Sequence, residues 1–239
     1  MISLSNYCQR LLRLRGISIV CRNADWCTEL DLDPKKWSKN CPLQPPKYFN
    51  DSVNTFINAY RAAEAGNINK AIELLGDTRG EDLRNWYIEH GQMSGWHYRV
   101  KALKKLKPKK YTGVLEKNKS FAKYESQVYQ RDGYRCGYCG LKVIDTKALM
   151  KMEKMVGKKQ FKVKGRNSER HGVALALRAT IDHIKPLTLG GRTRLDNLVT
   201  SCWSCNYGKL NATLEQLGIL NPLGKSSTTH QRWDGLMNI

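Results

Sequence analysis

The chain has 239 residues and a formal net charge of +20 at pH 7, which is long enough for one large domain or two modest ones. Its eight cysteines are too sparse for a secreted disulfide scaffold, and the longest N-terminal apolar run, Ile17 to Cys21, is too short for a signal peptide or a membrane span. We therefore expect a cytoplasmic protein with no membrane contact. Residues 1–24 contain four arginines, three serines and no acid, which is typical of an organelle transit peptide and equally of a short amphipathic helix.

The positive charge is concentrated in the middle of the chain. Residues 99–170 contain 22 lysines and arginines against six acids, whereas residues 1–98 contain 12 basic and 11 acidic side chains. This concentration is typical of proteins that bind a polyanion such as DNA or RNA. A solvated lysine-rich face kept for solubility has the same composition, so charge alone leaves both alternatives open.

Residues 1–100 are predicted to form a mainly helical N-terminal domain of unknown role. Four prolines between residues 26 and 46 predict an irregular packed loop after a first helical stretch. Apolar residues then recur at intervals of three and four, and glycines follow the first two of these periodic stretches. The predicted helices are 52–66, 71–76 and 81–92. The four cysteines of this region, at positions 8, 21, 27 and 41, have no CxxC spacing and are either buried free thiols or a second zinc site.

Residues 101–123 follow as a basic linker or a DNA-contacting arm. The segment KALKKLKPKK at 101–110 contains six lysines and a helix-breaking proline, which fits either role. We place a second domain at residues 124–220, with a lysine-rich insertion at 141–180, and a C-terminal tail at residues 221–239.

Two CxxC pairs lie within the second domain and bracket an Asp-His dipeptide. Cys136 and Cys139 lie in RDGYRCGYCG, and Cys202 and Cys205 lie in SCWSCN. Four thiolates from two such knuckles make a closed tetrahedral zinc site, which is structural because it leaves no open position for water. Such sites contribute about 10 to 16 kcal/mol of binding free energy in small peptides, so we expect zinc to stabilise this domain. The alternative is four unligated core cysteines.

The region between the two cysteine pairs predicts a strand, a returning strand and a helix. Residues 173–184 are apolar with β-branched residues near the end, which predicts a strand. Two glycines at 190–191 mark a turn, and residues 198–199 predict the returning strand. A helix over about 204–217 follows and is closed by a glycine.

The predicted strand places Asp182 and His183 at its edge, beside the start of the helix. Asp182 and Asn206 can then offer oxygen atoms to one hard cation such as Mg²⁺. A neutral imidazole can remove a proton from water near pH 7, as hydrolysis of a phosphodiester requires.

These motifs together resemble the HNH, or ββα-metal, nuclease family, in its zinc-stabilised branch. The resemblance covers residues 124–217. It is carried by the four cysteines, DHIKP at 182–186, the glycine pair at 190–191, DNL at 196–198, and CNYGK at 205–209. The implied fold class is α+β, with a C-terminal ββα-metal domain and a structural zinc site after a helical N-terminal domain.

The resemblance also implies a role for each matching residue. His183 would be the general base, while Asp182 and Asn206 would bind the catalytic divalent ion, Mg²⁺ or another cation. Asn197 would fix the loop that orients the histidine, and Lys209 would face a phosphate.

The insertion at 141–180 departs from the family pattern, which has a short connection there. We predict a helix over 147–155 and a hairpin around Gly165, and we expect the insertion to recognise the substrate. The candidate nucleic-acid contacts are Lys162, Lys164, Arg166, Arg192 and Arg194. Each of the two loop arginines among them could equally be a solvated side chain.

The resemblance implies a metal-dependent endonuclease that cuts double-stranded DNA to leave 5′-phosphate and 3′-hydroxyl ends, and this is the expected function. A restriction-type enzyme fits a chain with its own N-terminal domain, and a phage or mobile-element nuclease and an unspecific defence effector are alternatives. The competing class is a noncatalytic zinc module that binds nucleic acid, and RNA is an alternative substrate. Cutting both strands with one site per chain would require two copies, so a homodimer is expected by symmetry.

Overall fold

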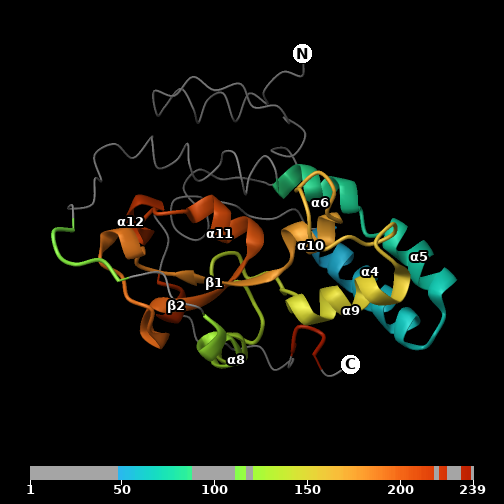
Figure 1. Cartoon of the computed structure of the whole chain (residues 1–239), viewed down its shortest axis with the longest axis horizontal. Helices are drawn as coiled ribbons and strands as arrows, with labels where there is room; N and C mark the ends of the chain where they lie inside the picture. The colour runs from blue at the N-terminus through green and yellow to red at the C-terminus, as the bar shows by residue number, and fades with distance from the viewer. Residues whose placement is uncertain (1–47, 88–110, 117–120, 218–220, 225–232, 238–239) are drawn as a thin grey trace, which may run out of the picture.

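The computed structural model describes residues 48–87, 111–116, 121–217, 221–224 and 233–237 (Figure 1). Within these ranges the chain forms short helices around one two-stranded antiparallel sheet, in agreement with the predicted α+β class. No helix in these ranges is long and apolar enough to cross a membrane. The predictions for residues 1–47, including their four cysteines, and for the lysine-rich segment 101–110 lie outside the described residues.

The predicted N-terminal helices are present in the described part of the chain. They are α4 (Tyr48–Glu64), α5 (Ile68–Gly76) and α6 (Gly80–Trp86). Helix α4 begins four residues earlier than predicted and buries one apolar face, which includes Phe56 and Tyr60. Asn67 caps α5, because its side-chain oxygen accepts a hydrogen bond from the backbone N–H of Lys70 at 3.3 Å.

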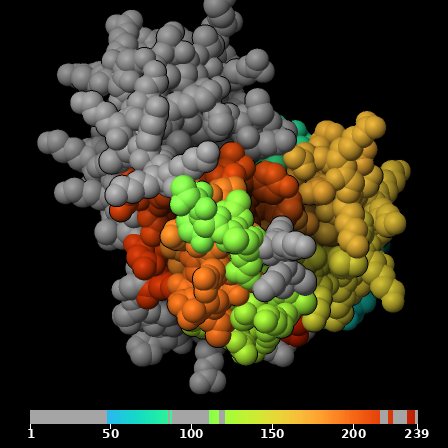
Figure 2. Space-filling view, turned by 60° about the vertical axis from the view of Figure 1, so that its left-hand side comes forward, coloured from blue at the N-terminus to red at the C-terminus, as the bar shows by residue number. Residues whose placement is uncertain are grey.

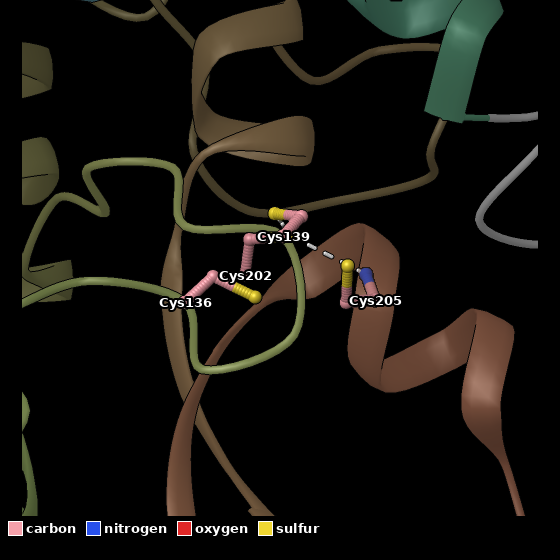
Figure 3. A group of neighbouring side chains, drawn as sticks. All are labelled: Cys136, Cys139, Cys202 and Cys205. Carbon is pink, nitrogen blue, oxygen red and sulfur yellow. Dashed lines mark hydrogen bonds between the residues drawn. The ribbon is translucent and has the colours of Figure 1, made fainter. Parts of the chain in front are cut away.

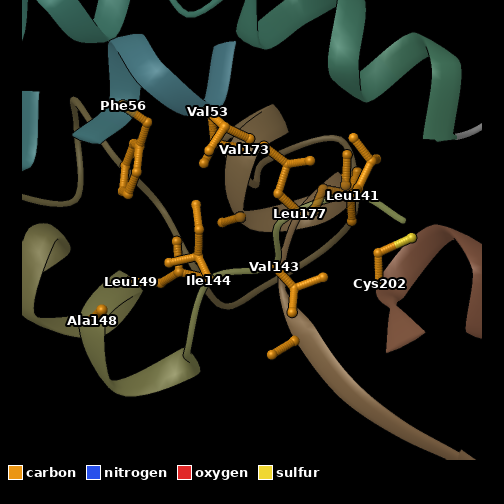
Figure 4. Packing of buried hydrophobic residues seen from close by; sticks show 14 of the residues in the cluster. Val53, Phe56, Leu141, Val143, Ile144, Ala148, Leu149, Val173, Leu177 and Cys202 are labelled. Atoms are coloured by element: carbon orange, nitrogen blue, oxygen red, sulfur yellow. The ribbon is translucent and has the colours of Figure 1, made fainter. Parts of the chain in front are cut away.

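A single hydrophobic cluster joins these helices to the rest of the described chain (Figure 4). The ring of Phe56 lies 5.3 Å from that of Phe161, which follows helix α9 (Thr146–Val156). Helix α10 (Gly172–Ala176) packs closely on α6, since a Cβ atom on Gly172 would lie only 1.8 Å from the carbonyl oxygen of Gly80. The N-terminal helices therefore share their core with residues of the insertion.

The insertion contains the predicted helix but not the predicted hairpin. Asp145 caps α9 by accepting a hydrogen bond from the backbone N–H of Lys147 at 2.8 Å. Around Gly165, which has a φ of +116°, the chain makes turns and no strand. The backbone N–H of His171 bonds the carbonyl of Lys162 at 2.8 Å, and this bond closes the loop where a ladder of strand pairing was expected.

The predicted strand over 173–184 is only half correct. Its first half is helix α10, and β1 covers Ala179–His183. His171 caps α10 by accepting a hydrogen bond from the N–H of Val173 at 3.3 Å. A short, fully buried apolar run looks the same in sequence whether it is a strand or a helix, and here the cap decides for the helix.

The returning strand and the following helix complete the ββα unit (Figure 1). Strand β2 (Leu198–Cys202) pairs with β1 so that Ala179 lies opposite Cys202 and His183 lies opposite Leu198. Helix α11 (Trp203–Lys209) packs on β1 and ends earlier than predicted, because Leu210 has a φ of +50°. A separate short helix, α12 (Leu214–Leu217), follows.

Candidate functional site

Four cysteines from two distant segments lie together beside the sheet (Figure 3). Cys136 and Cys139 lie in the loop after helix α8 (Ala122–Arg131), whereas Cys202 ends β2 and Cys205 lies in the first turn of α11. Their four Sγ atoms are within 4.8 Å of one another, and those of Cys139 and Cys202 are 3.9 Å apart. Sulfur atoms at about 2.3 Å from a tetrahedral zinc ion lie about 3.8 Å from each other, so the cluster has the size that zinc requires.

The backbone around the cysteines is arranged to hold them in place. The Sγ atom of Cys202 caps α11 by accepting a hydrogen bond from the N–H of Cys205 at 3.3 Å. The N–H of Gly137 donates to Thr200 O of β2 at 2.8 Å, so the first knuckle is attached to the strand that leads to the second. Among the described residues this is the one group of three or more His, Cys, Asp or Glu side chains whose ligand atoms lie this close. The cluster is compatible with a structural zinc ion.

Strand β1 and helix α11 meet in a regular register. Alternate residues of β1, counted from Arg178 just before the strand, each contact a residue of α11, and the contacted helix residues are three positions apart. The three pairs are Arg178 with Trp203, Thr180 with Asn206, and Asp182 with Lys209. Side chains two apart on a strand lie on the same face, so this register places Asp182 and Asn206 on the same side of the sheet.

Asp182 is buried and uses only one of its two oxygen atoms in contacts with the described protein. Its Oδ2 atom accepts a hydrogen bond from the hydroxyl of Tyr138 at 2.6 Å and pairs with the Nζ atom of Lys209 at 3.0 Å. Within the described chain, Oδ1 has no hydrogen-bond partner. Because Oδ2 is fixed by a hydroxyl and an ammonium, the orientation of the carboxylate is set and Oδ1 remains available as a ligand atom.

Asn206 is oriented in the same way. Its Nδ2 atom donates to Thr180 Oγ1 at 2.8 Å and to Ile181 O at 3.2 Å. A backbone carbonyl can only accept, so the amide NH₂ must face the strand. The Oδ1 atom of Asn206 then points away from β1 and makes no hydrogen bond within the described residues. Asp182 and Asn206 thus each present one open oxygen atom, the donor type that hard divalent cations prefer.

His183 ends strand β1, and its imidazole is enclosed by residues other than those around Asp182. Its Nε2 atom lies 3.1 Å from Thr193 Oγ1, and its ring centroid lies 5.2 Å from that of Phe121. Neighbouring strand residues point to opposite faces, so the imidazole and the Asp182 carboxylate lie on different sides of the strand end. Burial lowers the pKa of His183 and outweighs Asp182, which raises it, while Lys209 lowers it further. The imidazole is therefore neutral at pH 7.

The side chain of Asn197 connects the two ends of the loop between the strands. Its Oδ1 atom accepts from Lys185 N at 2.8 Å, and its Nδ2 atom donates to Lys185 O at 3.0 Å and to Arg192 O at 2.9 Å. Next to Arg192, the N–H of Thr193 donates to Glu116 Oε2 at 3.0 Å. These bonds fix the segment that holds the Thr193 hydroxyl against the imidazole of His183.

The structure differs from the expectation for Lys209. We expected this side chain to face a phosphate, but it is completely buried, with its Nζ atom bonded to His183 O at 2.7 Å as well as to Asp182. An ammonium taken out of water has to be paired, and the sheet supplies both partners. Lys209 therefore holds the end of β1 from inside the protein.

The five predicted nucleic-acid contacts lie in different environments. Lys164, Arg166 and Arg192 are exposed. Lys162 pairs with Glu169 at 2.6 Å, and Arg194 pairs with Asp196 at 3.2 Å, so part of their charge is compensated locally. In the space-filling view the yellow and gold atoms of the insertion lie to one side of the green and orange atoms of α8 and the sheet region (Figure 2).

Sequence reasoning missed three side chains that shape the site. Tyr138, inside the first cysteine knuckle, bonds Asp182, and burial raises its pKa well above the usual value, so it acts as a hydrogen-bond donor. Thr193 and Phe121 contact the imidazole. No spacing rule marks them, although a tyrosine between two zinc-site cysteines is a signal that could have drawn attention to the first.

Comparison with known families agrees with this geometry. Residues 166–211 match the HNH endonuclease family. The matched segment contains both strands, helix α11 and the second pair of cysteines, whereas the first pair lies N-terminal to it. No curated protein and no solved structure matches the chain. The C-terminal part of this chain is therefore an HNH endonuclease domain, and its cluster of four cysteines is consistent with the zinc-stabilised branch of that family.

Proposed function

We propose that the protein is a metal-dependent endonuclease that hydrolyses phosphodiester bonds of DNA and leaves 5′-phosphate and 3′-hydroxyl ends. One observation supports this most directly. The end of β1 carries a fixed imidazole whose pKa is lowered by burial, and on the α11 side of the strand Asp182 and Asn206 each keep one oxygen atom without a hydrogen-bond partner among the described residues, within an HNH domain.

His183 would act as the general base. If its Nε2–H donates to Thr193 Oγ1, the lone pair lies on Nδ1, which has no hydrogen-bond partner among the described residues. Nδ1 takes a proton from a water molecule, the water oxygen forms a bond to phosphorus, and the bond from phosphorus to O3′ breaks, after which O3′ takes a proton from solvent water to give the 3′-hydroxyl. Because Asp182 and His183 lie on opposite sides of the strand end, the phosphate has to lie across that end.

Asp182 and Asn206 would hold the divalent cation. The donor set fits a hard ion such as Mg²⁺, since both ligand atoms are oxygens and both side chains are held by other bonds. A bound cation would offset the negative charge that develops on the phosphate and on the leaving oxygen. With one carboxylate and one neutral amide the protein supplies little negative charge, so other divalent ions should also serve.

Lys209 and Asn197 would be positioning residues. Lys209 fixes both the Asp182 carboxylate and the backbone of His183, and Asn197 fixes the loop that supplies Thr193. Neither has to touch the substrate to affect the reaction. In this scheme His183 carries out the proton transfer, and the residues around it hold the imidazole in the required orientation.

Cleavage of supercoiled plasmid by the purified zinc-loaded protein in magnesium tests the function. We expect cutting by the natural protein, a loss of at least about a hundredfold in rate for His183→Ala, and no change for Thr188→Ala, an exposed side chain of the same loop. Equal nicking by the natural protein and His183→Ala would reject His183 as the base. Binding without any cutting would instead support a noncatalytic module.

The same assay distinguishes the specific from the unspecific nuclease. Discrete fragments would support a restriction-type enzyme, and a smear would support an unspecific effector. We favour recognition of a site in double-stranded DNA, because the insertion and the N-terminal helices form one hydrophobic core and can present a fixed surface beside the domain. Two copies would be required to cut both strands at one position.

A further inference from the structure

A group of arginine and aromatic side chains surrounds the pair of Arg178 and Trp203 at the first turn of α11. The guanidinium carbon of Arg178 lies 3.5 Å from the centroid of the Trp203 ring, and that of Arg170 lies 5.9 Å from it. The ring of Tyr207, one turn further along the helix, is 4.7 Å from that of Trp203 and is 40% exposed. We call these four residues the arginine–tryptophan cluster.

The tryptophan is fixed from below. Its Nε1 atom donates to the hydroxyl of Tyr87 at 2.8 Å, and Tyr87 is buried at the end of α6. Burial raises the pKa of Tyr87 to about 12, so the phenol stays neutral and adds no negative charge to the cluster. The N–H of Trp203 also bonds Arg178 O at 3.1 Å. Arg178 therefore stacks on an indole ring whose orientation is fixed by these two hydrogen bonds.

The positive charge of the cluster is not compensated by the described protein. Some arginines of these ranges lie against acids, as Arg79 does with Asp82 at 2.6 Å and Arg131 with Asp132 at 2.7 Å, and others, such as Arg61, are exposed to solvent. Arg170 and Arg178 make no such pair within the described chain, and their Nε atoms are buried without a hydrogen-bond partner. Burial, and then the charge of Arg170, lower the pKa of Arg178. Two guanidinium groups whose buried Nε atoms have no hydrogen-bond partner offer a favourable place for an anion.

The cluster lies in line with the candidate catalytic residues. Arg178 begins the row of strand residues that continues through Thr180 to Asp182 on the α11 side of β1. Four strand residues span about 13 Å. Successive phosphates on one DNA strand advance about 3.4 Å along the helix axis, so a phosphate at the cluster is a different one from the phosphate at the candidate catalytic residues.

We propose that the arginine–tryptophan cluster binds a phosphodiester group of the nucleic-acid backbone other than the one that is cut. A planar guanidinium presents parallel N–H donors that match phosphate oxygens, and stacking on Trp203 fixes the plane from which they point. The proposal deepens the proposed function, and it rests on that function for the position of the bond that is cut. It also identifies which part of the insertion contacts the substrate, namely its C-terminal end.

Salt-dependent binding tests this site without any cleavage. Full-length zinc-loaded protein is titrated into a fluorescently labelled duplex without divalent cations, at several NaCl concentrations, and affinity is read from anisotropy. Each phosphate contact contributes about 0.9 to the slope of log affinity against log salt, or on the order of eightfold in affinity at 0.1 M. We expect Arg178→Gln and Arg170→Gln each to lower the slope by about one, and Arg61→Gln, an exposed arginine of α4, to leave it unchanged.

Zinc content and thermal unfolding show whether each variant is folded. If Arg178→Gln loses its structure, Arg170→Gln carries the test, because Arg170 does not stack closely on the ring. Unchanged slopes in the folded variants would overturn the proposal and leave the stack a structural feature. Parallel titrations with duplex DNA and duplex RNA of one sequence show which nucleic acid supplies the phosphate.

The outcomes for this site and for hydrolysis are separate. A protein that cuts plasmid in magnesium but shows unchanged slopes in both variants would refute the phosphate site alone. A protein that shows the lower slopes but never cuts would support the phosphate site and refute the proposed hydrolysis.

Discussion

Replacing Lys209 by methionine tests whether this lysine is an internal support or a substrate contact. The substitution keeps the length of the side chain but removes the ammonium that bonds Asp182 Oδ2 at 3.0 Å and His183 O at 2.7 Å. The two charged side chains are 0% and 10% exposed, so removing the lysine leaves a carboxylate buried without its counter-charge. Breaking a buried pair in this way costs about 3–5 kcal/mol, and we expect the free energy of unfolding to fall by that amount.

Urea unfolding of the zinc-loaded protein, followed by tryptophan fluorescence, measures the effect of Lys209→Met. The midpoint should fall while the dependence on urea stays the same. Lys70→Met is the matched control, since Lys70 and Glu73 form a pair with 48% and 63% exposure, and its effect should stay below about 1 kcal/mol. Adding Asp182→Asn to Lys209→Met should recover part of the loss, because the uncompensated carboxylate is then gone.

The opposite result would identify Lys209 as a substrate contact. In that case Lys209→Met would leave the unfolding free energy unchanged, and it would lower the salt dependence of DNA binding by about one. Such an outcome would refute the internal role that we derive from its burial.

Three further predictions concern metal and pH. Metal analysis should find about one zinc per chain. The variant Cys205→Ser should bind no zinc, and its C-terminal region should no longer show a cooperative unfolding transition. A variant that loses zinc but stays folded would contradict a structural role. His171 has a pKa lowered to about 4 by burial, so the unfolded chain binds more protons below about pH 6.5. Stability should therefore fall from pH 6.5 towards 4, by at most about 3 kcal/mol, and His171→Phe should remove this part of the pH dependence in urea titrations. Since burial lowers the pKa of His183, initial cleavage rates should stay constant around neutral pH and fall only below pH 6.5, whereas a fall beginning above pH 7 would argue against a neutral imidazole base.

Features that depend on neighbouring residues in the sequence were predicted well. The CxxC knuckles met around one centre, because two cysteines at this spacing place both sulfurs on one side of a tight turn. Strand β2 and the starts of helices α5, α9 and α11 were also predicted within a few residues, since caps and apolar periodicity are local signals.

Features that depend on distant packing were not predictable. The run from Gly172 to Ala176 became a helix rather than a strand, because its cap and its contact with α6 outweigh its composition. Lys209 looked like a surface cation until the sheet supplied two buried partners. Tyr138 reaches Asp182 only because the cysteine knuckle folds over β1.

Cys202 caps the short helix α11, which contains Cys205 as well as Asn206 and Lys209. A shift of α11 by one residue would rotate its side chains by about 100° and take the amide of Asn206 away from Thr180. The cysteines at the N-terminal end of α11 thus fix the rotation of the helix about its own axis. Loss of the structural ion should therefore damage the catalytic oxygen ligands even in molecules that remain compact.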